Sequence, residues 1–257
     1  MIAADSLPLP RPVSSPFVQL RALLRLVRLG LHLLWGCTTV VTVFPFIGLD
    51  KRRWLKQRWS RQLLQVLGVA LHIRGEAPRG LVVANHISFL DIFAINAAAP
   101  AAFVSKDDVL NWPVIGWLSR HTETLFMARG SRNAAQRTRE ALVQHLGDGH
   151  LAALFPEGTT SAGKEVLPFH GALFQSAIDA GVPVSPVALR YRDERDNPSL
   201  APAYIDDVSL GQCLWSIASS TGLVVEVRML PSHDSRETDR RHLSAHCHHA
   251  ISVALRH

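Results

Sequence analysis

The chain has 257 residues, 47% of them hydrophobic, and this apolar content excludes a disordered protein. Residues 1–80 hold 12 basic and 3 acidic side chains, a net charge of +9, whereas the remaining 177 hold 15 and 18, a net charge of −3. The mildly acidic larger part argues against a nucleic-acid-binding protein. After residue 50 no uncharged apolar run reaches the ~20 residues of a membrane span, which excludes a multi-helix transporter.

The first 16 residues are rich in proline and serine and are expected to form a flexible lead-in. From Phe17 onward, apolar residues recur at helical spacing. The opposite face of this helix carries Arg21, Arg25 and Arg28. An uncharged run of 21 residues then extends from Leu29 to Leu49, which is just long enough to cross a bilayer.

Residues 17–67 are therefore expected to form a membrane-associated helical region. Basic residues flank both ends of the apolar run, so loop charge gives no single-span orientation. We favour a monotopic helical hairpin whose arginines meet anionic headgroups from one side of the bilayer. A single span and a buried core helix are the alternatives. Trp54 and Trp59 lie beside basic residues and suit either a membrane interface or a protein core.

After Gly68, short β-branched runs alternate with amphipathic stretches. This alternation predicts an α/β fold over residues 68–257, with a mostly parallel central sheet flanked by helices. The expected strands are residues 69–74, 81–84, 101–105, 123–127, 151–155, 184–191 and 223–229. The expected helices are residues 88–98, 131–146, 171–180 and 235–254. Functional groups of such sheets gather where strands end.

The first polar block is Asn-His-Ile-Ser-Phe-Leu-Asp at residues 85–91, between a strand and a helix. Asp91 lies among apolar residues, and a buried carboxylate needs hydrogen-bond partners. One interpretation is a capping box between Ser88 and Asp91. In the other, Asp91 accepts from one imidazole nitrogen of His86 and leaves the other nitrogen free as a base. Since five positions along a helix lie ~140° apart, His86 would then sit outside the helix and fold back over its first turn.

Three further blocks follow at strand boundaries. Phe-Pro-Glu-Gly-Thr-Thr-Ser at residues 155–161 combines a turn-forming glycine with hydroxyl side chains, although alone it fits an ordinary turn. In residues 126–132, Arg129 and Arg132 at a helix start are well placed to hold an anion, with a solvated surface pair as the alternative. Residues 182–187 form a proline-marked entry into a strand.

Together the four blocks resemble the 1-acylglycerol-3-phosphate acyltransferase family and its wider lysophospholipid and glycerolipid acyltransferase relatives, over residues 68–190. The resemblance implies that His86 is the catalytic base and that Asp91 orients it. It also implies that the acceptor is bound by Lys106, Arg129, Glu157, Gly158 and Thr159. Pro113 and Gly116 match a looser family pattern. Two positions depart from the family, because Ala128 stands where members often have Asp and Thr160 stands where many have Arg.

The implied reaction moves a fatty acyl chain from acyl carrier protein or coenzyme A to the free hydroxyl of a lysolipid. The expected acceptor is 1-acyl-sn-glycerol-3-phosphate, giving phosphatidic acid. The Glu-Gly-Thr-Thr form is similar to that of a bacterial subgroup that includes lyso-ornithine lipid acyltransferases, so lyso-ornithine lipid is the alternative acceptor. No metal and no cofactor beyond the acyl thioester is expected. The expected location is the cytoplasmic face of the inner membrane, with membrane lipid as a partner and no nucleic acid.

Three other classes of protein compete with this interpretation. A serine hydrolase needs a Gly-x-Ser-x-Gly elbow, which the chain lacks. A metal protein would use the histidine-rich tail, where His242, His246 and His249 fall on one helical face but have no acidic residue among them. A non-catalytic membrane-binding protein would leave Asp91 and Arg129 without a role. Three widely spaced cysteines with no Cys-x-x-Cys pair give neither a disulfide framework nor a thiolate zinc site, and they suit a reducing compartment.

Overall fold

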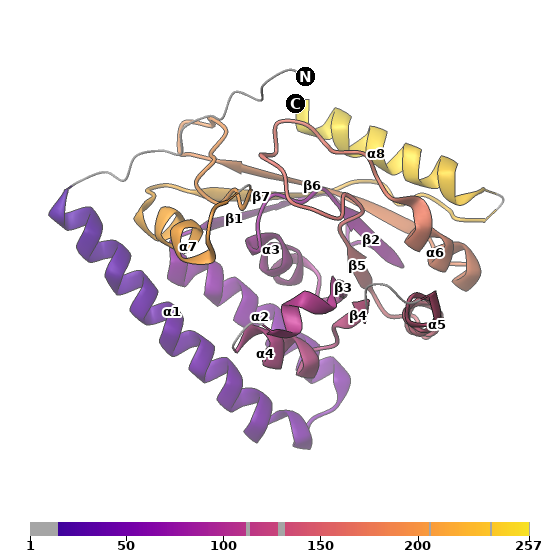
Figure 1. The fold of residues 1–257 in the computed structure, drawn as a ribbon, viewed down its shortest axis with the longest axis horizontal. Coiled ribbons are helices and arrows are strands. Elements are labelled where there is room, and N and C mark those ends of the chain that lie inside the picture. Colours follow the sequence, from indigo (N-terminus) through magenta and orange to yellow (C-terminus); the bar gives the residue numbers. More distant parts are fainter. Residues whose placement is uncertain (1–14, 112–113, 128–131, 206, 237, 257) are drawn as a thin grey trace.

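The computed structural model describes residues 15–111, 114–127, 132–205, 207–236 and 238–256, with the backbone alone described at 106, 108 and 132–135. The described residues form a seven-stranded sheet in the order β1-β7-β6-β2-β5-β3-β4 (Figure 1). Neighbouring strands are parallel except for β6 and β7, which confirms the predicted mostly parallel sheet. The strands are β1 (Ala70–Arg74), β2 (Leu81–Ala84), β3 (Ala102–Lys106), β4 (Leu125–Met127), β5 (Ala152–Leu154), β6 (Val184–Arg192) and β7 (Val224–Met229).

Each expected strand is present in the sheet, and its bounds shift by no more than a few residues. The helices include two that the sequence did not predict, α4 and α7. The second of these starts with a capping box between Ser209 and Gln212, a signal that could have revealed it. The helices are α1 (Pro16–Thr42), α2 (Leu49–Leu67), α3 (Leu90–Ala98), α4 (Ile115–His121), α5 (Arg132–Gly147), α6 (Phe174–Ala180), α7 (Leu210–Ser219) and α8 (Arg240–Arg256).

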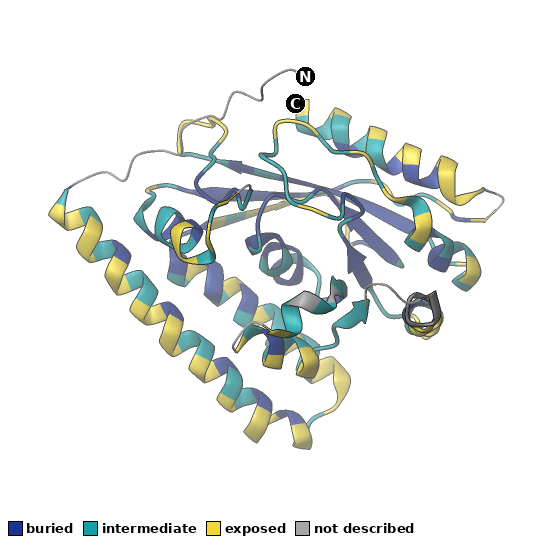
Figure 2. Cartoon of the chain, in the orientation of Figure 1, coloured by how far each residue is buried: buried dark blue, intermediate teal, exposed yellow. Residues whose placement is uncertain are grey.

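The central strand β2 separates two hydrophobic cores, because successive side chains of a strand point to opposite faces. Val82 and Ala84 pack into one core with residues of α2, α3 and α7. Leu81 and Val83 pack into the other with residues of α5, α6 and α8. Figure 2 shows that the middle of the sheet is buried between these layers. Burial on both faces explains why the central strands β2 and β5 are continuous apolar runs in the sequence.

Helix α1 is packed along its length against the rest of the chain. Its buried residues Ala22, Leu29, Gly36 and Val40 lie on one side. Gly36 allows the closest approach, because a Cβ atom there would lie 2.7 Å from the Trp59 indole nitrogen on α2. Leu29 belongs to the same hydrophobic core as the sheet. The helical region and the sheet therefore form one packed body, whereas the domain boundary expected between residues 67 and 68 stays a prediction.

Two arginines of α1 bind protein rather than facing away from it. Arg25 donates to the carbonyl oxygens of Ala218 and Ser220 at 2.9 and 2.8 Å, and Arg21 donates to that of Ser219 at 3.0 Å. These carbonyls lie at the C-terminal end of α7, where the helix dipole attracts cations. The expectation that the arginines of this region meet lipid headgroups is therefore wrong for Arg21 and Arg25.

Helix α2 is attached to the domain in the same way. Arg53 and Lys56 form ion pairs with Glu123, in the turn before β4, at 2.7 and 3.3 Å. Arg61 donates to the Ala97 carbonyl at 2.7 Å, at the C-terminal end of α3. Much of the positive charge near the N-terminus thus holds α1 and α2 against the sheet domain.

Candidate active site

The Asp91 carboxylate lies in the first turn of α3 and is completely buried. Its Oδ2 atom accepts hydrogen bonds from His86 Nδ1 at 2.9 Å, from the Ile87 N–H at 2.6 Å and from the Ser88 N–H at 2.9 Å. Its Oδ1 atom accepts from the Tyr191 hydroxyl at 2.8 Å. Four donors compensate the carboxylate for the water that it loses on burial.

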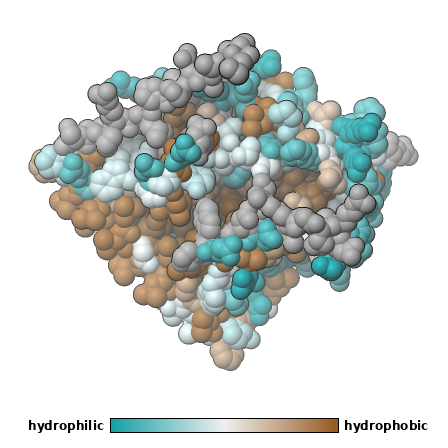
Figure 3. Space-filling model, viewed as in Figure 1, coloured by the Kyte–Doolittle hydropathy of each residue, from teal (hydrophilic) through white to brown (hydrophobic). Residues whose placement is uncertain are grey.

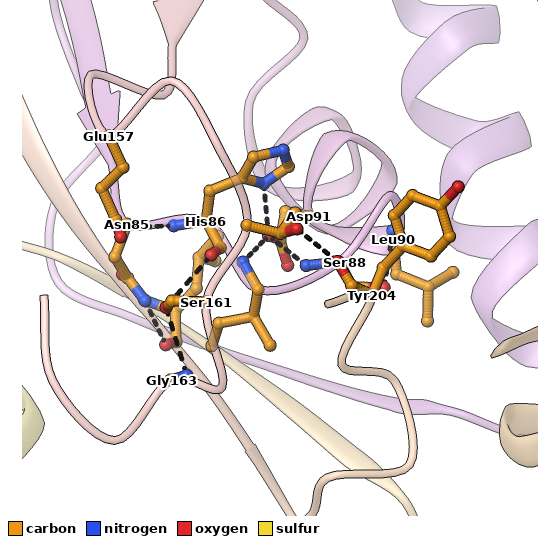
Figure 4. A network of polar contacts seen from close by, with 12 residues as sticks. Asn85, His86, Ser88, Leu90, Asp91, Glu157, Ser161, Gly163 and Tyr204 are labelled. Atoms are coloured by element: carbon orange, nitrogen blue, oxygen red, sulfur yellow. Dashed lines mark hydrogen bonds and ion pairs between the residues drawn. The ribbon is translucent and has the colours of Figure 1, made fainter. Parts of the chain in front are cut away.

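The two interpretations of Asp91 have different outcomes. A capping box between Ser88 and Asp91 does not form, because Phe89 is the N-cap of α3 without a side-chain cap bond and the Ser88 hydroxyl accepts from Leu90, although the Ser88 N–H donates to Asp91. The bond from His86 is the predicted contact, and it is confirmed: His86 precedes α3 and its ring points back toward the carboxylate (Figure 4). The helix start and the histidine therefore share one acceptor atom.

The His86 imidazole is held on its face as well as at its edge. It stacks on Phe155 with ring centroids 3.9 Å apart and an angle of 7° between the planes. Because Nδ1 donates to Asp91, Nε2 carries the lone pair of the neutral ring. The side chain is 19% exposed, so solvent or a substrate can approach it. This arrangement suits a general base.

Glu157 braces the backbone that carries His86. It is 4% exposed; its Oε1 accepts the His86 N–H at 2.8 Å and its Oε2 accepts the Leu167 N–H at 3.1 Å. Burial raises the pKa of Glu157, and the two N–H donors oppose that rise. Both oxygens are bound to backbone, so Glu157 shapes the loop, and its expected contact with the acceptor stays a prediction.

Gly158 and Thr159 lie on the same loop. Gly158 has φ +68°, in the left-handed region that favours glycine, and its N–H donates to the Phe155 carbonyl at 3.1 Å. Thr159 is exposed at the edge of a groove of about 500 Å³. The groove borders the His86 backbone, because Ser161 in its wall donates its N–H to the His86 carbonyl at 2.8 Å. Its lining residues are Thr159, Thr160, Ser161, Ala162, Leu167, Tyr204 and Ile205.

Gly163 packs the groove loop against the residue next to His86. It has φ +71°, and a Cβ atom there would lie 2.6 Å from Ile87 Cδ1. The Ile87 N–H donates to Asp91, and the Ile87 carbonyl accepts the Tyr204 N–H at 3.0 Å. A side chain at position 163 would therefore press on the end of the Ile87 side chain, next to the backbone groups that hold the site together.

Replacing Gly163 by alanine is expected to lower the free energy of unfolding by about 2–4 kcal/mol, since backbone strain and overpacking act together. Gly181→Ala is the matched control, because Gly181 has φ +64° and open space around the added Cβ. It should lose only the ~1–2 kcal/mol of backbone strain. Thermal or denaturant unfolding of both variants measures the difference, and equal losses would refute a role for the Ile87 contact.

The two serines near His86 do not form a nucleophile–base pair. The Ser88 hydroxyl accepts the Leu90 N–H at 3.3 Å in a buried position. The Ser161 hydroxyl donates to the His86 carbonyl at 3.4 Å and accepts the Gly163 N–H at 3.2 Å. Within the described residues, neither hydroxyl is bonded to the His86 ring, which is what serine catalysis requires.

The side chains of two expected substrate-binding residues, Arg129 and Lys106, are not among those that the structure describes. Arg129 lies outside the described residues, as does Pro113. Lys106 ends β3, where its backbone pairs with Met127 at the end of β4, but its side chain is not described. The roles of Arg129 and Lys106 stay predictions. The contacts bring together His86, Asp91 and Glu157, with Gly158 and Thr159 on the adjoining loop.

Comparison with known proteins decides the family. A family model described as Acyltransferase matches residues 69–190. A 1-acyl-sn-glycerol-3-phosphate acyltransferase of Neisseria meningitidis serogroup B is 40% identical over 187 residues, covering 71% of this chain and 73% of the relative. The chain belongs to the acyltransferase family. A lyso-ornithine lipid O-acyltransferase of Pseudomonas aeruginosa is 37% identical over 206 residues, covering 79% of each chain.

The fold agrees with this assignment. The crystal structure of a 1-acyl-sn-glycerophosphate acyltransferase, PlsC, from Thermotoga maritima matches with a TM-score of 0.64 and 20% identity, covering 90% of this chain and 96% of that one. The motifs that carried the resemblance lie within the residues matched by the family model.

The histidine-rich tail of this acyltransferase takes part in other contacts. His242 Nδ1 bonds to Asp239 at 2.7 Å, and the His246 ring stacks on His233 with centroids 4.1 Å apart. In the described part of the chain, no three histidine, cysteine or acidic side chains gather as a metal site would require.

Sequence reasoning missed the residues that complete the site from a distance. Tyr191 and Gly163 are two of them. Asn85 is a third, because its side chain pairs with both the N–H and the carbonyl of Leu189 at 2.8 and 3.0 Å and so anchors the end of β2 to β6. Asn85 was visible as part of the first motif, but its partner lies 104 residues away.

Proposed function

We propose that this acyltransferase moves a fatty acyl chain from a thioester to the free hydroxyl of a lysolipid, most directly 1-acyl-sn-glycerol-3-phosphate. The observation that carries the proposal is the His86–Asp91 pair, in which Nδ1 is bound to a buried carboxylate and the imidazole side chain is 19% exposed. Acyl carrier protein or coenzyme A would supply the acyl group, and no further cofactor or metal takes part in the scheme.

The reaction follows from this geometry. Nε2 of His86 removes the proton of the acceptor hydroxyl as its oxygen attacks the thioester carbon, a step in which positioned bases supply ~10²–10⁴-fold. Asp91 holds the Nδ1–H tautomer and stabilises the imidazolium. The C–S bond then breaks, and the thiolate takes the proton from His86. The N–H groups of Gly158, Ile87 and Ser88 are already bonded, and those of Thr159 and Thr160, next to Gly158, would be the oxyanion donors.

A lyso-ornithine lipid is the second candidate acceptor, and the composition of the groove favours it. Hydroxyl and apolar side chains line the groove, and none of its described lining residues is basic. A phosphate monoester is bound most strongly by arginine or lysine, whereas hydroxyls serve neutral or zwitterionic headgroups as well. Arg129 and Lys106 are the residues that would supply a cation for the phosphate.

An acyl-transfer assay with a panel of acceptors tests the proposal. The purified enzyme is given acyl carrier protein and coenzyme A thioesters with lysophosphatidic acid or lyso-ornithine lipid, and labelled products are separated. Formation of phosphatidic acid supports the first acceptor, and formation of ornithine lipid supports the second. Thioester hydrolysis without transfer to either lysolipid would overturn the proposed function.

We also propose that the enzyme binds the bilayer as a monotopic protein on its cytoplasmic face, through one side of α1. This side, opposite the buried stripe, carries an apolar surface (Figure 3). Apolar patches of such extent mark interaction surfaces, and a helix of this kind lies in the membrane interface. Because the other side of α1 is bound to α2 and α7, a membrane crossing would have to break those contacts. The exposed apolar residues are Phe17, Leu20, Leu23, Leu24, Val27, Leu31, Leu34, Trp35 and Val41.

Replacing Leu24 and Leu31 together by serine is expected to weaken vesicle binding about 100-fold, because two leucine side chains contribute ~3 kcal/mol or more on burial. Co-sedimentation with phosphatidylethanolamine–phosphatidylglycerol vesicles measures it. Val253→Ser is the matched control, since Val253 is an exposed apolar residue on α8. If the double variant and the control bind vesicles equally well, the exposed apolar side of α1 is not the membrane-binding surface. If the wild type loses vesicle binding in high salt, charge rather than apolar contact holds it to the membrane.

A further inference from the structure

Tyr191 is the one donor to Asp91 that comes from a distant part of the chain. It lies near the end of β6, 100 residues after Asp91, and is 3% exposed. Among the described residues, its hydroxyl is the only partner of Asp91 Oδ1, whereas the other three donors share Oδ2. The two oxygens are thus held from opposite sides of the site.

Two-sided anchoring fixes the plane of the carboxylate. The three bonds at Oδ2 come from one short segment, and a carboxylate held at one oxygen alone can turn about its Cβ–Cγ bond. The bond from Tyr191 removes that freedom, because β6 is paired with β2 and cannot move independently of the strand that leads to His86. Burial and the nearby Asp91 raise the pKa of Tyr191 well above 10, so the hydroxyl remains a donor at any working pH.

We propose that Tyr191 is a positioning residue for acyl transfer: its hydroxyl orients Asp91 and thereby sets the tautomer and the basicity of His86. The inference rests on the proposed role of His86 as the base. A donor at Oδ1 draws negative charge away from the carboxylate and weakens its hold on an imidazolium. Removing the donor leaves Asp91 more negative but less well aligned.

Among the residues that the structure describes, three titratable groups face the Asp91–His86 pair from neighbouring elements. They are Glu157 on the loop after β5, Tyr191 on β6 and Cys213 on α7. Burial raises the pKa of Cys213 to about 11, so Cys213 and Tyr191 remain neutral in an ordinary assay. Glu157 is common to every variant below, and a change in the pH profile between variants therefore reports on His86.

Tyr191→Phe removes one hydroxyl and keeps the ring. We expect kcat to fall about 10-fold, a part of the ~10²–10⁴-fold that a positioned base supplies, with the KM values for both substrates unchanged. The acidic limb of kcat/KM should move to higher pH, since a more negative Asp91 raises the pKa of the imidazolium. Ser176→Ala is the matched control, because it deletes a completely buried hydroxyl on α6, away from the site. This control should retain the wild-type profile.

A second experiment keeps the Tyr191 hydroxyl and therefore does not require that the Tyr191→Phe protein folds. The chain has two tyrosines, so incorporation of 3-fluorotyrosine into Tyr204→Phe protein modifies Tyr191 alone. Fluorine makes the phenol a stronger donor, and the acidic limb should move to lower pH than in the unlabelled Tyr204→Phe protein. An unchanged limb in both experiments would overturn the inference, even if stability had changed. Full activity of His86→Ala would overturn it together with the role of His86 as the base, whereas an inactive His86→Ala with a normal Tyr191→Phe would overturn the inference alone. Thioester hydrolysis without acyl transfer by the wild type would overturn the proposed function.

Discussion

Replacing His86 by alanine is expected to lower the rate of acyl transfer about 10²–10⁴-fold, the whole contribution of a positioned general base. The protein should still fold, since Asp91 keeps the N–H donors of Ile87 and Ser88 and the hydroxyl donor of Tyr191. Thioester consumption and lipid product are measured together, and vesicle binding shows that the membrane surface is intact.

The control for this variant is His249→Ala, because His249 is exposed on α8 and lies far along the chain from the site. It should transfer acyl groups at the wild-type rate. Turnover of His86→Ala within a few-fold of the wild type would show that another group acts as the base, and the mechanism would then fail at its first step.

Replacing Glu157 by alanine is expected to lower the free energy of unfolding by about 2–6 kcal/mol, because the N–H groups of His86 and Leu167 would lose their acceptors in a buried place and each costs ~1–3 kcal/mol. Activity should fall with it, since the His86 backbone loses its brace. Denaturant unfolding in detergent, alongside the transfer assay, measures both effects.

Glu165→Ala is the matched control on the same loop. Glu165 is exposed, and its removal should change stability by no more than ~0.5 kcal/mol. If Glu157→Ala instead unfolds like the wild type while the KM for the acceptor rises, Glu157 binds substrate and the brace assigned to it here is incorrect.

The central strands β2 and β5 could be predicted because burial on both faces makes each of them a short apolar run. The contact between His86 and Asp91 could be predicted because both lie within one turn of a helix start. Helix α7 was not predicted because no strong charge pattern marks its exposed face. Its Ser209–Gln212 capping box is nevertheless a helix-start signal in the sequence.

Other features depend on partners that the local sequence does not reveal. The sequence around Arg25 is compatible with binding to a lipid headgroup and with binding to the carbonyls of α7. Only the tertiary fold shows that Arg25 binds those carbonyls. In the sequence, Tyr191 is simply an aromatic residue in an expected strand. Its bond to Asp91 depends on the pairing of β6 with β2, which the local sequence does not show. Gly163 belongs to none of the four sequence blocks, and its packing against Ile87 is a property of the assembled loop.

The docking of α1 also has a consequence for biosynthesis. Arg21 and Arg25 bind carbonyls that lie 198 and 193 residues later in the chain. At the usual rates of translation, α1 is complete about 10–40 s before its partners on α7 exist. Helix α2 follows directly and can pack against α1, but the partners of α1 on α7 are still missing during that interval. In the proposed membrane-bound arrangement, the exposed apolar side of α1 would therefore meet the bilayer before the enzyme has a catalytic site, and membrane contact would be an early event in its assembly.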